Sequence, residues 1–149
     1  MLGGVMQDPF DLDRFVQAQA PVMDRVLEEL RQGRKATHWI WFVFPQIHGL
    51  GRSAMAERFA ISSLAEAKAY LGHPVLGPRL VECTRLMNVQ AGRSAFDILG
   101  PPDDLKFHAS MTLFAKAADK GWDFQRALDR FFDGQRHAAT IEQLRSDGP

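Results

Sequence analysis

The chain has 149 residues, of which 46% are hydrophobic and 24% are charged. This composition is typical of one globular domain and excludes a disordered or fibrous chain. Lysine plus arginine number 18, and so do aspartate plus glutamate, so the formal net charge is zero. No overall field draws the protein to nucleic acid, anionic lipid or acidic partners, and we expect neither nucleic acid nor a membrane as a partner.

Cys83 is the single cysteine of the sequence, so the chain can form neither an internal disulfide nor a cysteine metal cluster. It falls in an apolar helical pattern, which predicts a buried thiol in a reducing compartment. Residues 1–7 lack the basic start and apolar stretch of a signal peptide. No apolar run approaches the roughly 20 residues that span a bilayer. The expected location is the cytoplasm.

Apolar spacings of three and four predict two helices, or one kinked helix, near the N-terminus. Asp8 before Pro9 predicts a helix start, because aspartate caps free backbone donors and proline fits the first helical turn. Pro21 interrupts the pattern and can open the next helix, which Gly33 ends. The two stripes are Leu12, Phe15, Val16 and Gln19, then Val22, Met23, Val26, Leu27 and Leu30.

The densest apolar segment is Trp39-Ile40-Trp41-Phe42-Val43-Phe44, which Pro45 ends. Its periodicity fits a buried strand or a buried helix, and its aromatic and β-branched residues also suit strands. Helix is favoured because Thr37 can cap the segment, helical patterns flank it and no second convincing strand exists to pair with it. A helix that is apolar on every side is buried, so we expect this one to be the central helix of the fold.

Caps and apolar spacings predict further short helices along the rest of the chain. The expected segments are residues 53–60, 63–71, 74 or 78 to 89, a short turn over 94–100, 103 or 104 to 118, a face of Phe124, Leu128, Phe131 and Phe132 that Gly134 closes, and a final helix with Ile141 and Leu144.

The predicted fold class is all-α, a compact single-domain bundle of about seven short helices around a central aromatic helix. We expect the domain over residues 8–145, with frayed termini at 1–7 and 146–149. The alternative is an α+β fold with one short strand pair.

The histidines and nucleophiles form no catalytic pattern. His38, His48, His73, His108 and His137 never recur at a spacing of three or four, and no His-Glu-x-x-His pattern exists, so we expect no metal site. The chain also lacks a Gly-x-Ser-x-Gly elbow. We expect no cofactor. The sequence assigns no catalytic residue and leaves open whether the protein is an enzyme.

A glycine-rich loop, Gly49-Leu50-Gly51-Arg52-Ser53-Ala54, leads into a predicted helix. Such a turn can present backbone donors and a positive helix end to an anion, and Arg52 adds a charged fork. As a dinucleotide fingerprint it fails, because that pattern needs a preceding parallel strand and an acid about 20 residues further on. Simple turn geometry and anion binding both stay open.

Polar residues next to the aromatic segment predict a pocket. On a helix His38 and Trp41 share one side, and apolar walls with a few polar groups are typical of small-ligand sites. Lys106 and Ser110 bring polar groups from another predicted helix. We expect a site for a small anionic or nucleotide-like ligand, with these candidate residues: His38, Trp41, Gln46, Gly49, Gly51, Arg52, Ser53, Lys106 and Ser110.

Two other interpretations of the aromatic segment stay open. Its side chains can simply be core, or they can be exposed and meet a protein partner, which would make the protein a non-catalytic interaction module. Burial separates the alternatives, because a concave polar-lined cavity indicates a ligand site and an exposed apolar patch indicates a partner. The sequence identifies no protein partner.

Four separated motifs resemble one known family. They are residues 38–46, residues 49–53, Tyr70-Leu71-Gly72-His73-Pro74 with Leu80, and Ser110-Met111-Thr112-Leu113-Phe114. In this order, between Asp8 and Leu144, they look like the bacterial and fungal domain of unknown function 1810.

That resemblance implies a compact, mainly α-helical single domain and supplies no catalytic residues. This chain has Ala109-Ser110 where the family pattern has two serines. Some members carry the label calpastatin. That label fits poorly, because such inhibitors resemble disordered, charged, repeat-bearing chains, whereas this chain has the composition of a packed domain.

Overall fold

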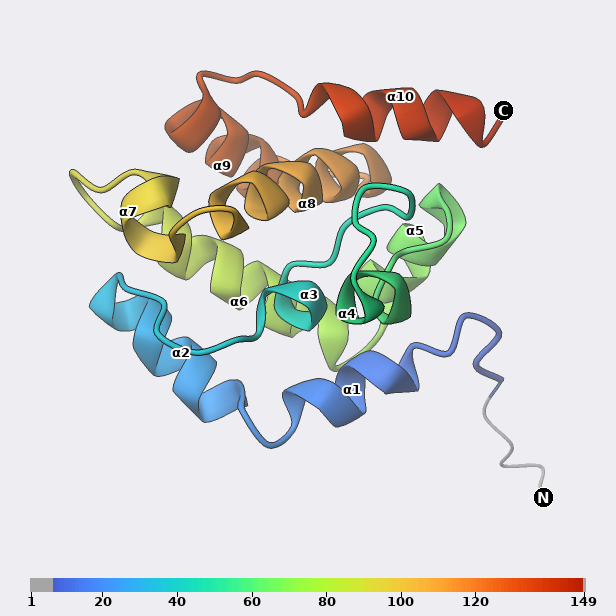
Figure 1. Ribbon diagram of the computed structural model, residues 1–149, viewed down its shortest axis with the longest axis horizontal. Coiled ribbons are helices and arrows are strands. Elements are labelled where there is room, and N and C mark those ends of the chain that lie inside the picture. The colour runs from blue at the N-terminus through green and yellow to red at the C-terminus, as the bar shows by residue number, and fades with distance from the viewer. Residues whose placement is uncertain (1–6, 149) are drawn as a thin grey trace.

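Helices make up the regular secondary structure of the computed structural model, which describes residues 7–148 (Figure 1). The predicted all-α class is confirmed. Of the expected frayed segments, residues 1–6 and Pro149 lie outside the described residues. The described helices are ten in number: α1 (Asp13–Gln19), α2 (Met23–Gln32), α3 (Ile40–Val43), α4 (Ala54–Arg58), α5 (Leu64–Gly72), α6 (Leu76–Asn88), α7 (Ala95–Leu99), α8 (Asp103–Ala117), α9 (Trp122–Phe132) and α10 (Ala138–Ser146).

The first helix begins later than predicted, at Asp13 with Leu12 in the N-cap position, and the predicted break at Pro21 lies between α1 and α2. Asp8 accepts hydrogen bonds from the backbone N–H groups of Asp13 and Leu12, at 3.0 and 2.8 Å. These two hydrogen bonds lower the pKa of the Asp8 carboxyl, and the bond from Asp13 has the larger effect. Pro21 separates α1 from α2, and Gly33 ends α2 in the left-handed region, with φ of 72°.

The aromatic segment forms a shorter helix than its length predicts. Only Ile40–Val43 is helical, and Phe44 already departs from helical geometry, with φ −121° and ψ 72°. Thr37 does not cap α3, because its N–H and hydroxyl both donate to Glu29, at 3.0 and 2.7 Å. Tertiary hydrogen bonds to Glu29 therefore determine the conformation of the chain before α3.

A single β-bridge stands in place of the alternative strand pair. Ile47 and Ile61 pair in parallel, with His48 N–H donating to Ile61 O and Ile61 N–H donating to Gln46 O, both at 2.9 Å. Within residues 7–148 this bridge does not extend into a strand. It fastens the loop after the aromatic segment to the chain that precedes α5.

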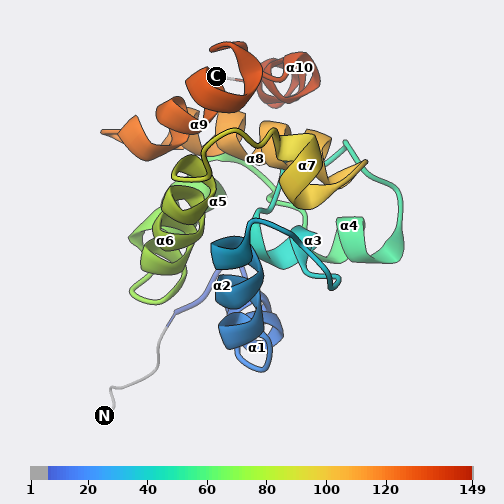
Figure 2. The same cartoon turned by 90° about the vertical axis from the view of Figure 1, so that its left-hand side faces the viewer.

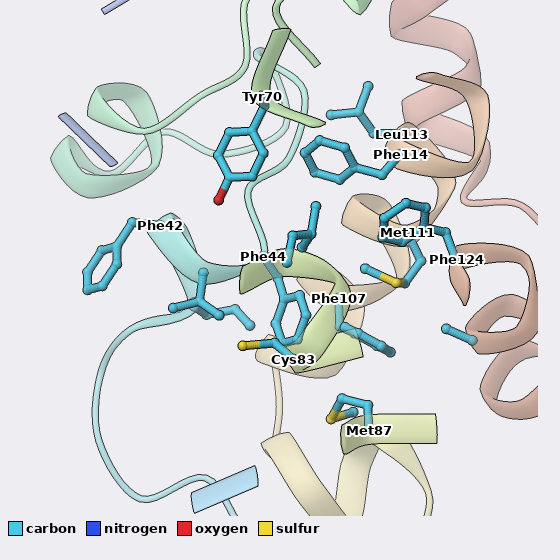
Figure 3. Close-up of a cluster of buried hydrophobic side chains, with 14 of the residues drawn as sticks. Phe42, Phe44, Tyr70, Cys83, Met87, Phe107, Met111, Leu113, Phe114 and Phe124 are labelled. Carbon is cyan, nitrogen blue, oxygen red and sulfur yellow. The ribbon is translucent and has the colours of Figure 1, made fainter. Parts of the chain in front are cut away.

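The helix with the longest buried surface is α8, which packs against α3, α5, α7, α9 and α10. The ring of Phe107 packs edge to face on the ring of Phe44, with ring centres 4.9 Å apart. Near the end of α8, the ring centres of Phe114 and Tyr70 are 5.3 Å apart. Figure 3 shows these rings in one cluster with Cys83. Burial raises the pKa of the Cys83 thiol to about 12, so the predicted buried thiol is confirmed and is unreactive at neutral pH.

Turning the molecule shows how the helices are layered (Figures 1 and 2). The pair α1 and α2 lies on one side and α9 with α10 on the other, and α3, α6 and α8 lie between them. In this arrangement α3 packs against both α1 and α8, so the aromatic segment joins the two sides of the core. None of the helices in the described part of the chain has the length and apolar character needed to cross a membrane.

Candidate functional site

A narrow hollow lies where α3, the loop after it, α4 and α8 meet. Trp41, Gln46 and Lys106 bring polar groups to it, so the fold gathers three of the predicted residues at one place. The hollow is small, since the centre of a water-sized sphere has only about 10 Å³ in it. That is the room of about one water molecule or one polar group of a ligand. Its apolar walls are Ile40, Phe44, Ala56 and Phe59.

The indole of Trp41 is the chemically unusual group of this hollow. Its Nε1 is buried and makes no hydrogen bond with any residue between 7 and 148. A buried donor left unpaired costs about 1 to 3 kcal/mol. The nitrogen of Lys106 lies 5.2 Å from the centre of the ring, within the range of a cation–π contact. The hollow therefore combines a buried, unpaired donor with a nearby positive charge.

A second lysine neutralises the acid nearest to this site. Asp103 lies 2.9 Å from Lys35 Nζ and 3.9 Å from Lys106 Nζ. The Lys35 side chain is 7% exposed and that of Asp103 is 17% exposed, whereas Lys106 is 24% exposed. Because Asp103 lies closer to Lys35 than to Lys106, it interacts more strongly with Lys35. The two lysines and the one carboxylate together leave a net positive charge beside the hollow.

The glycine loop divides between the hollow and another contact. A Cβ on Gly51 would lie 2.7 Å from the Ala56 Cβ and 3.4 Å from Gln46 Nε2, so Gly51 lets the loop close around two lining residues. Gly49 has φ of +88°, and its missing Cβ would meet Gln143 Oε1 of α10 at 2.7 Å. Gly51 therefore shapes the hollow, and Gly49 lets the loop approach α10.

Three further polar candidates do not reach the hollow. His38, Arg52 and Ser53 are exposed and are absent from its lining. The Ser53 hydroxyl oxygen accepts from Ala56 N–H at 3.1 Å and thereby caps α4. Since α4 has five residues, its N-terminus presents a weak dipole. The structure therefore does not join these three residues to Trp41.

Ser110 is fully buried one helical turn beyond Lys106 on α8. Its hydroxyl has no hydrogen-bond partner among the described residues, yet it does not line the hollow. Ser110 is therefore a neighbour of Lys106 along α8 but does not contribute to the hollow.

Sequence patterns missed a buried polar network next to the aromatic segment. Gln19 Nε2 donates to Phe42 O at 2.6 Å and to Tyr70 OH at 3.0 Å, and Arg79 reaches Gln19 Oε1 at 3.3 Å. Burial raises the pKa of the Tyr70 hydroxyl. A signal existed, since a glutamine at a position of the apolar stripe of α1 must find partners inside the core. The network fixes α1 against α3.

The histidines near the C-terminus are tied into structure. His108 stacks on Phe132 with ring centres 3.9 Å apart and bonds to Gln135 O at 2.7 Å. His137 N–H donates to Thr112 Oγ1 at 2.9 Å, and burial lowers the pKa of its imidazole. Across residues 7–148, no group of three histidine, cysteine, aspartate or glutamate side chains is arranged to hold a metal ion.

The fold and the hollow together define an all-α domain with a small, donor-lined cavity beside its aromatic core. The model of the family described as protein of unknown function, DUF1810, matches residues 9–144. The chain belongs to this family, and the resemblance drawn from its motifs is confirmed. Among curated proteins, none matches the chain.

A solved structure shares the whole fold. It is the crystal structure of the conserved hypothetical protein Rv1873 from Mycobacterium tuberculosis, which is 58% identical to this chain. The match covers 93% of this chain and 99% of that one, with a TM-score of 0.91. The descriptions of the family and of this relative assign no specific function.

Proposed function

We propose that the protein is a small-ligand binding domain in which the hollow beside Trp41 receives one anionic oxygen of the ligand. The unpaired, buried Nε1 of Trp41 is the observation that carries this proposal. An acceptor placed there removes the cost of the orphan donor. Lys106 and Gln46 line the same hollow and supply further donors, and hydrogen bonds from a charged donor to an anion are the stronger ones.

The protein contains its own precedent for this chemistry. Trp39 lies two residues away, has Lys35 Nζ 5.1 Å from its ring centre, and donates its indole N–H to Glu29 Oε1 at 2.9 Å. Trp41 has the same kind of lysine contact but no carboxylate. The pairing at Trp39 supports a carboxylate, or another oxyanion such as phosphate, as the group that suits Trp41.

The size of the hollow supports entry by one group of the ligand. Space for about one water molecule accommodates a single oxygen, while the rest of the ligand stays outside. Trp41 and Lys106 are both partly exposed, so the residues that line the hollow also face solvent, while the Trp41 Nε1 itself is buried. A small anionic compound fits these dimensions, and we assign no reaction to the site.

Acetate and inorganic phosphate, each titrated at constant ionic strength, test the proposal. The Trp122→Phe variant removes the indole that is 74% exposed. The remaining fluorescence then comes from Trp41 and from Trp39, which is buried and paired with Glu29, so a change that is lost in Trp41→Phe reports on the hollow. We expect fluorescence to change saturably and the Tm to rise with ligand concentration, as mass action requires. Lys106→Met should weaken binding about tenfold or more, which corresponds to about 1.4 kcal/mol.

Lys68→Met is the matched control, because Lys68 is also a helical lysine but is exposed on α5. It should bind the anions as the unmodified protein does. Equal loss in both lysine variants would indicate general charge attraction and would overturn the assignment to the hollow. Absence of any saturable response to either anion would overturn it as well.

A second candidate function, a non-catalytic interaction module, is favoured by a different surface. The aromatic segment does not supply an exposed patch, since Trp41 is its only residue that is not buried. Val89 and Trp122 are instead 70% and 74% exposed, beside the pair of Arg85 and Asp123 at 3.1 Å that joins α6 to α9. Sedimentation at increasing concentration tests self-association through this surface. Trp122→Ser should abolish any association, and a monomer at every concentration would contradict it.

A further inference from the structure

An open groove lies beside α10 and is separate from the hollow at Trp41. Its volume is about 500 Å³, within the range of small-molecule sites. It is built where α10 lies over α8 and approaches the start of α5, along one edge of the molecule (Figure 1). It shares no lining residue with the hollow, and none of its residues belongs to the site predicted from the sequence.

The groove combines an apolar floor with a cationic rim. Leu64, Ile141 and Leu144 are half-buried and line it. Three exposed cations and Gly148 complete the lining, and none of the described lining residues carries a carboxylate. The cations, which come from α8, the loop before α10 and α10 itself, are Lys116, Arg136 and Arg145.

These cations have no side-chain partner in the described part of the chain. Neither a hydrogen bond nor an ion pair joins the side chain of Lys116, Arg136 or Arg145 to any residue from 7 to 148. Some cations of the protein are paired, as Arg14 is with Glu66 at 3.0 Å and Arg85 is with Asp123 at 3.1 Å, so what distinguishes Lys116, Arg136 and Arg145 is that they gather around one apolar groove. Three unpaired positive charges around apolar side chains complement a ligand that has a negative head and a hydrocarbon body.

The groove is held in shape before any ligand arrives. At the start of α10, His137 N–H donates to Thr112 Oγ1 at 2.9 Å. At its end, Asp147 lies 3.0 Å from His48 Nε2. Because α10 is fastened at both ends, binding does not have to pay for ordering this helix, and preorganised sites bind more tightly.

We propose that this groove binds a free anionic amphiphile, such as a medium-chain carboxylate, with its head at the three cations and its chain along Leu64, Ile141 and Leu144. A volume of about 500 Å³ lies within the range of small-molecule sites and so suits a compound of that size. The inference is independent of the proposed function, because it concerns another site and other residues.

Calorimetric titration with hexanoate, octanoate and decanoate, all below micelle-forming concentrations, tests the inference. Affinity should rise up to about fourfold with each methylene that enters the groove. Decanol, which has the chain without the charge, should bind about tenfold or more weakly. A flat dependence on chain length, or no binding of decanoate, overturns the proposal.

Paired variants assign the site. Arg136→Gln combined with Arg145→Gln should weaken decanoate binding about tenfold or more, and both side chains are exposed, so the fold should be unaffected. Arg25→Gln combined with Arg126→Gln is the matched control, because these arginines are also exposed but lie on α2 and α9. Equal weakening in both double variants overturns the assignment.

Two further arms separate this site from other sources of the same chemistry. Decanoate titrations repeated in the Lys106→Met background remove the lysine of the hollow beside Trp41. The dependence of affinity on chain length and on Arg136 and Arg145 should persist in that background, and its loss would assign the binding to the hollow and overturn the groove. Vesicles containing phosphatidylglycerol should displace decanoate from the protein only as far as their free lipid monomers do. Binding to vesicles without binding to free decanoate would indicate a membrane surface and would likewise overturn the proposal.

Discussion

Trp39 and Trp41 are two residues apart in the sequence but lie in opposite chemical situations. Trp39 is 1% exposed and its indole N–H is paired with Glu29 at 2.9 Å. Trp41 is partly exposed and its indole N–H has no partner in the described part of the chain. Each ring has a lysine nitrogen near its face, at 5.1 and 5.2 Å. The difference between the two indoles is one carboxylate. Glu29 satisfies the indole N–H of Trp39 inside the core, whereas no carboxylate satisfies the indole N–H of Trp41, which we propose pairs with a ligand.

Glu29 shows how much that carboxylate does at Trp39. Besides the indole, it accepts from the N–H groups of Ala36 and Thr37 at 2.7 and 3.0 Å and from the Thr37 hydroxyl at 2.7 Å. Burial by itself raises the pKa of Glu29, but these hydrogen bonds outweigh it and lower the pKa to about 2. A buried anion is stable here because its acceptors are satisfied.

The largest expected effect distinguishes the two indoles by stability. Trp39→Ala should cost about 3 to 5 kcal/mol, because it opens a cavity and leaves Glu29 without one donor. Trp41→Ala should cost about 1 to 2 kcal/mol, because the ring is partly exposed and its N–H gives up no bond. Denaturant melts of both variants measure the gap, and equal losses would break the comparison.

Acid should reveal the Glu29 carboxylate. Its pKa is lowered from the ordinary 4.5 to about 2 on folding, so its contribution is fully present above pH 4.5 and is lost as the pH falls toward 2. At about 1.4 kcal/mol per pKa unit, this contribution is about 3 kcal/mol. Glu29→Gln should remove most of it at neutral pH. Urea melts between pH 2 and 7 should then show a flatter acid limb for the variant; an unchanged limb would show that other carboxyls set it.

Gly51→Ala sharpens the comparison on the Trp41 side. The added methyl would lie 2.7 Å from the Ala56 Cβ, so the wall of the hollow must shift, at a cost of about 1 to 3 kcal/mol. Anion binding at the hollow should fall in the same variant. Gly72→Ala is the control, because nothing lies within 4 Å of its added methyl, and it should be neutral or slightly stabilising. Tm and anion titrations measure both, and identical behaviour of the two variants would remove Gly51 from the hollow.

Arg52→Ala should have the smallest effect. The side chain is exposed and lies outside the hollow, and exposed charges contribute about 0 to 1 kcal/mol. Thermal melts with and without phosphate should match those of the unmodified protein. Early melting would show that Arg52 holds the loop to the core, and a lost phosphate response would return the glycine loop to the candidate site.

The sequence by itself determined the all-α class, because caps and three-four spacings are local and need only neighbouring residues. Helix α8 illustrates this: the residues from Asp103 or Asp104 to about Ala118 were predicted to be helical, and Asp103–Ala117 is. The buried Cys83 followed from the same periodicity. The family also followed, because its motifs are contiguous stretches of chain.

Only the tertiary structure decided the roles of the two tryptophans. Glu29 reaches Trp39 from α2, and Lys106 reaches Trp41 from α8, and no local pattern reports which distant side chain arrives at an indole. The same holds for the start of α3, since the Thr37 hydroxyl donates to Glu29 of α2 and the helix begins only at Ile40. The sequence did predict Trp41, Gln46 and Lys106 as candidate residues, from their residue types and their neighbours in the chain. Their separation from His38, Arg52 and Ser53 was not, because burial depends on how the whole chain packs.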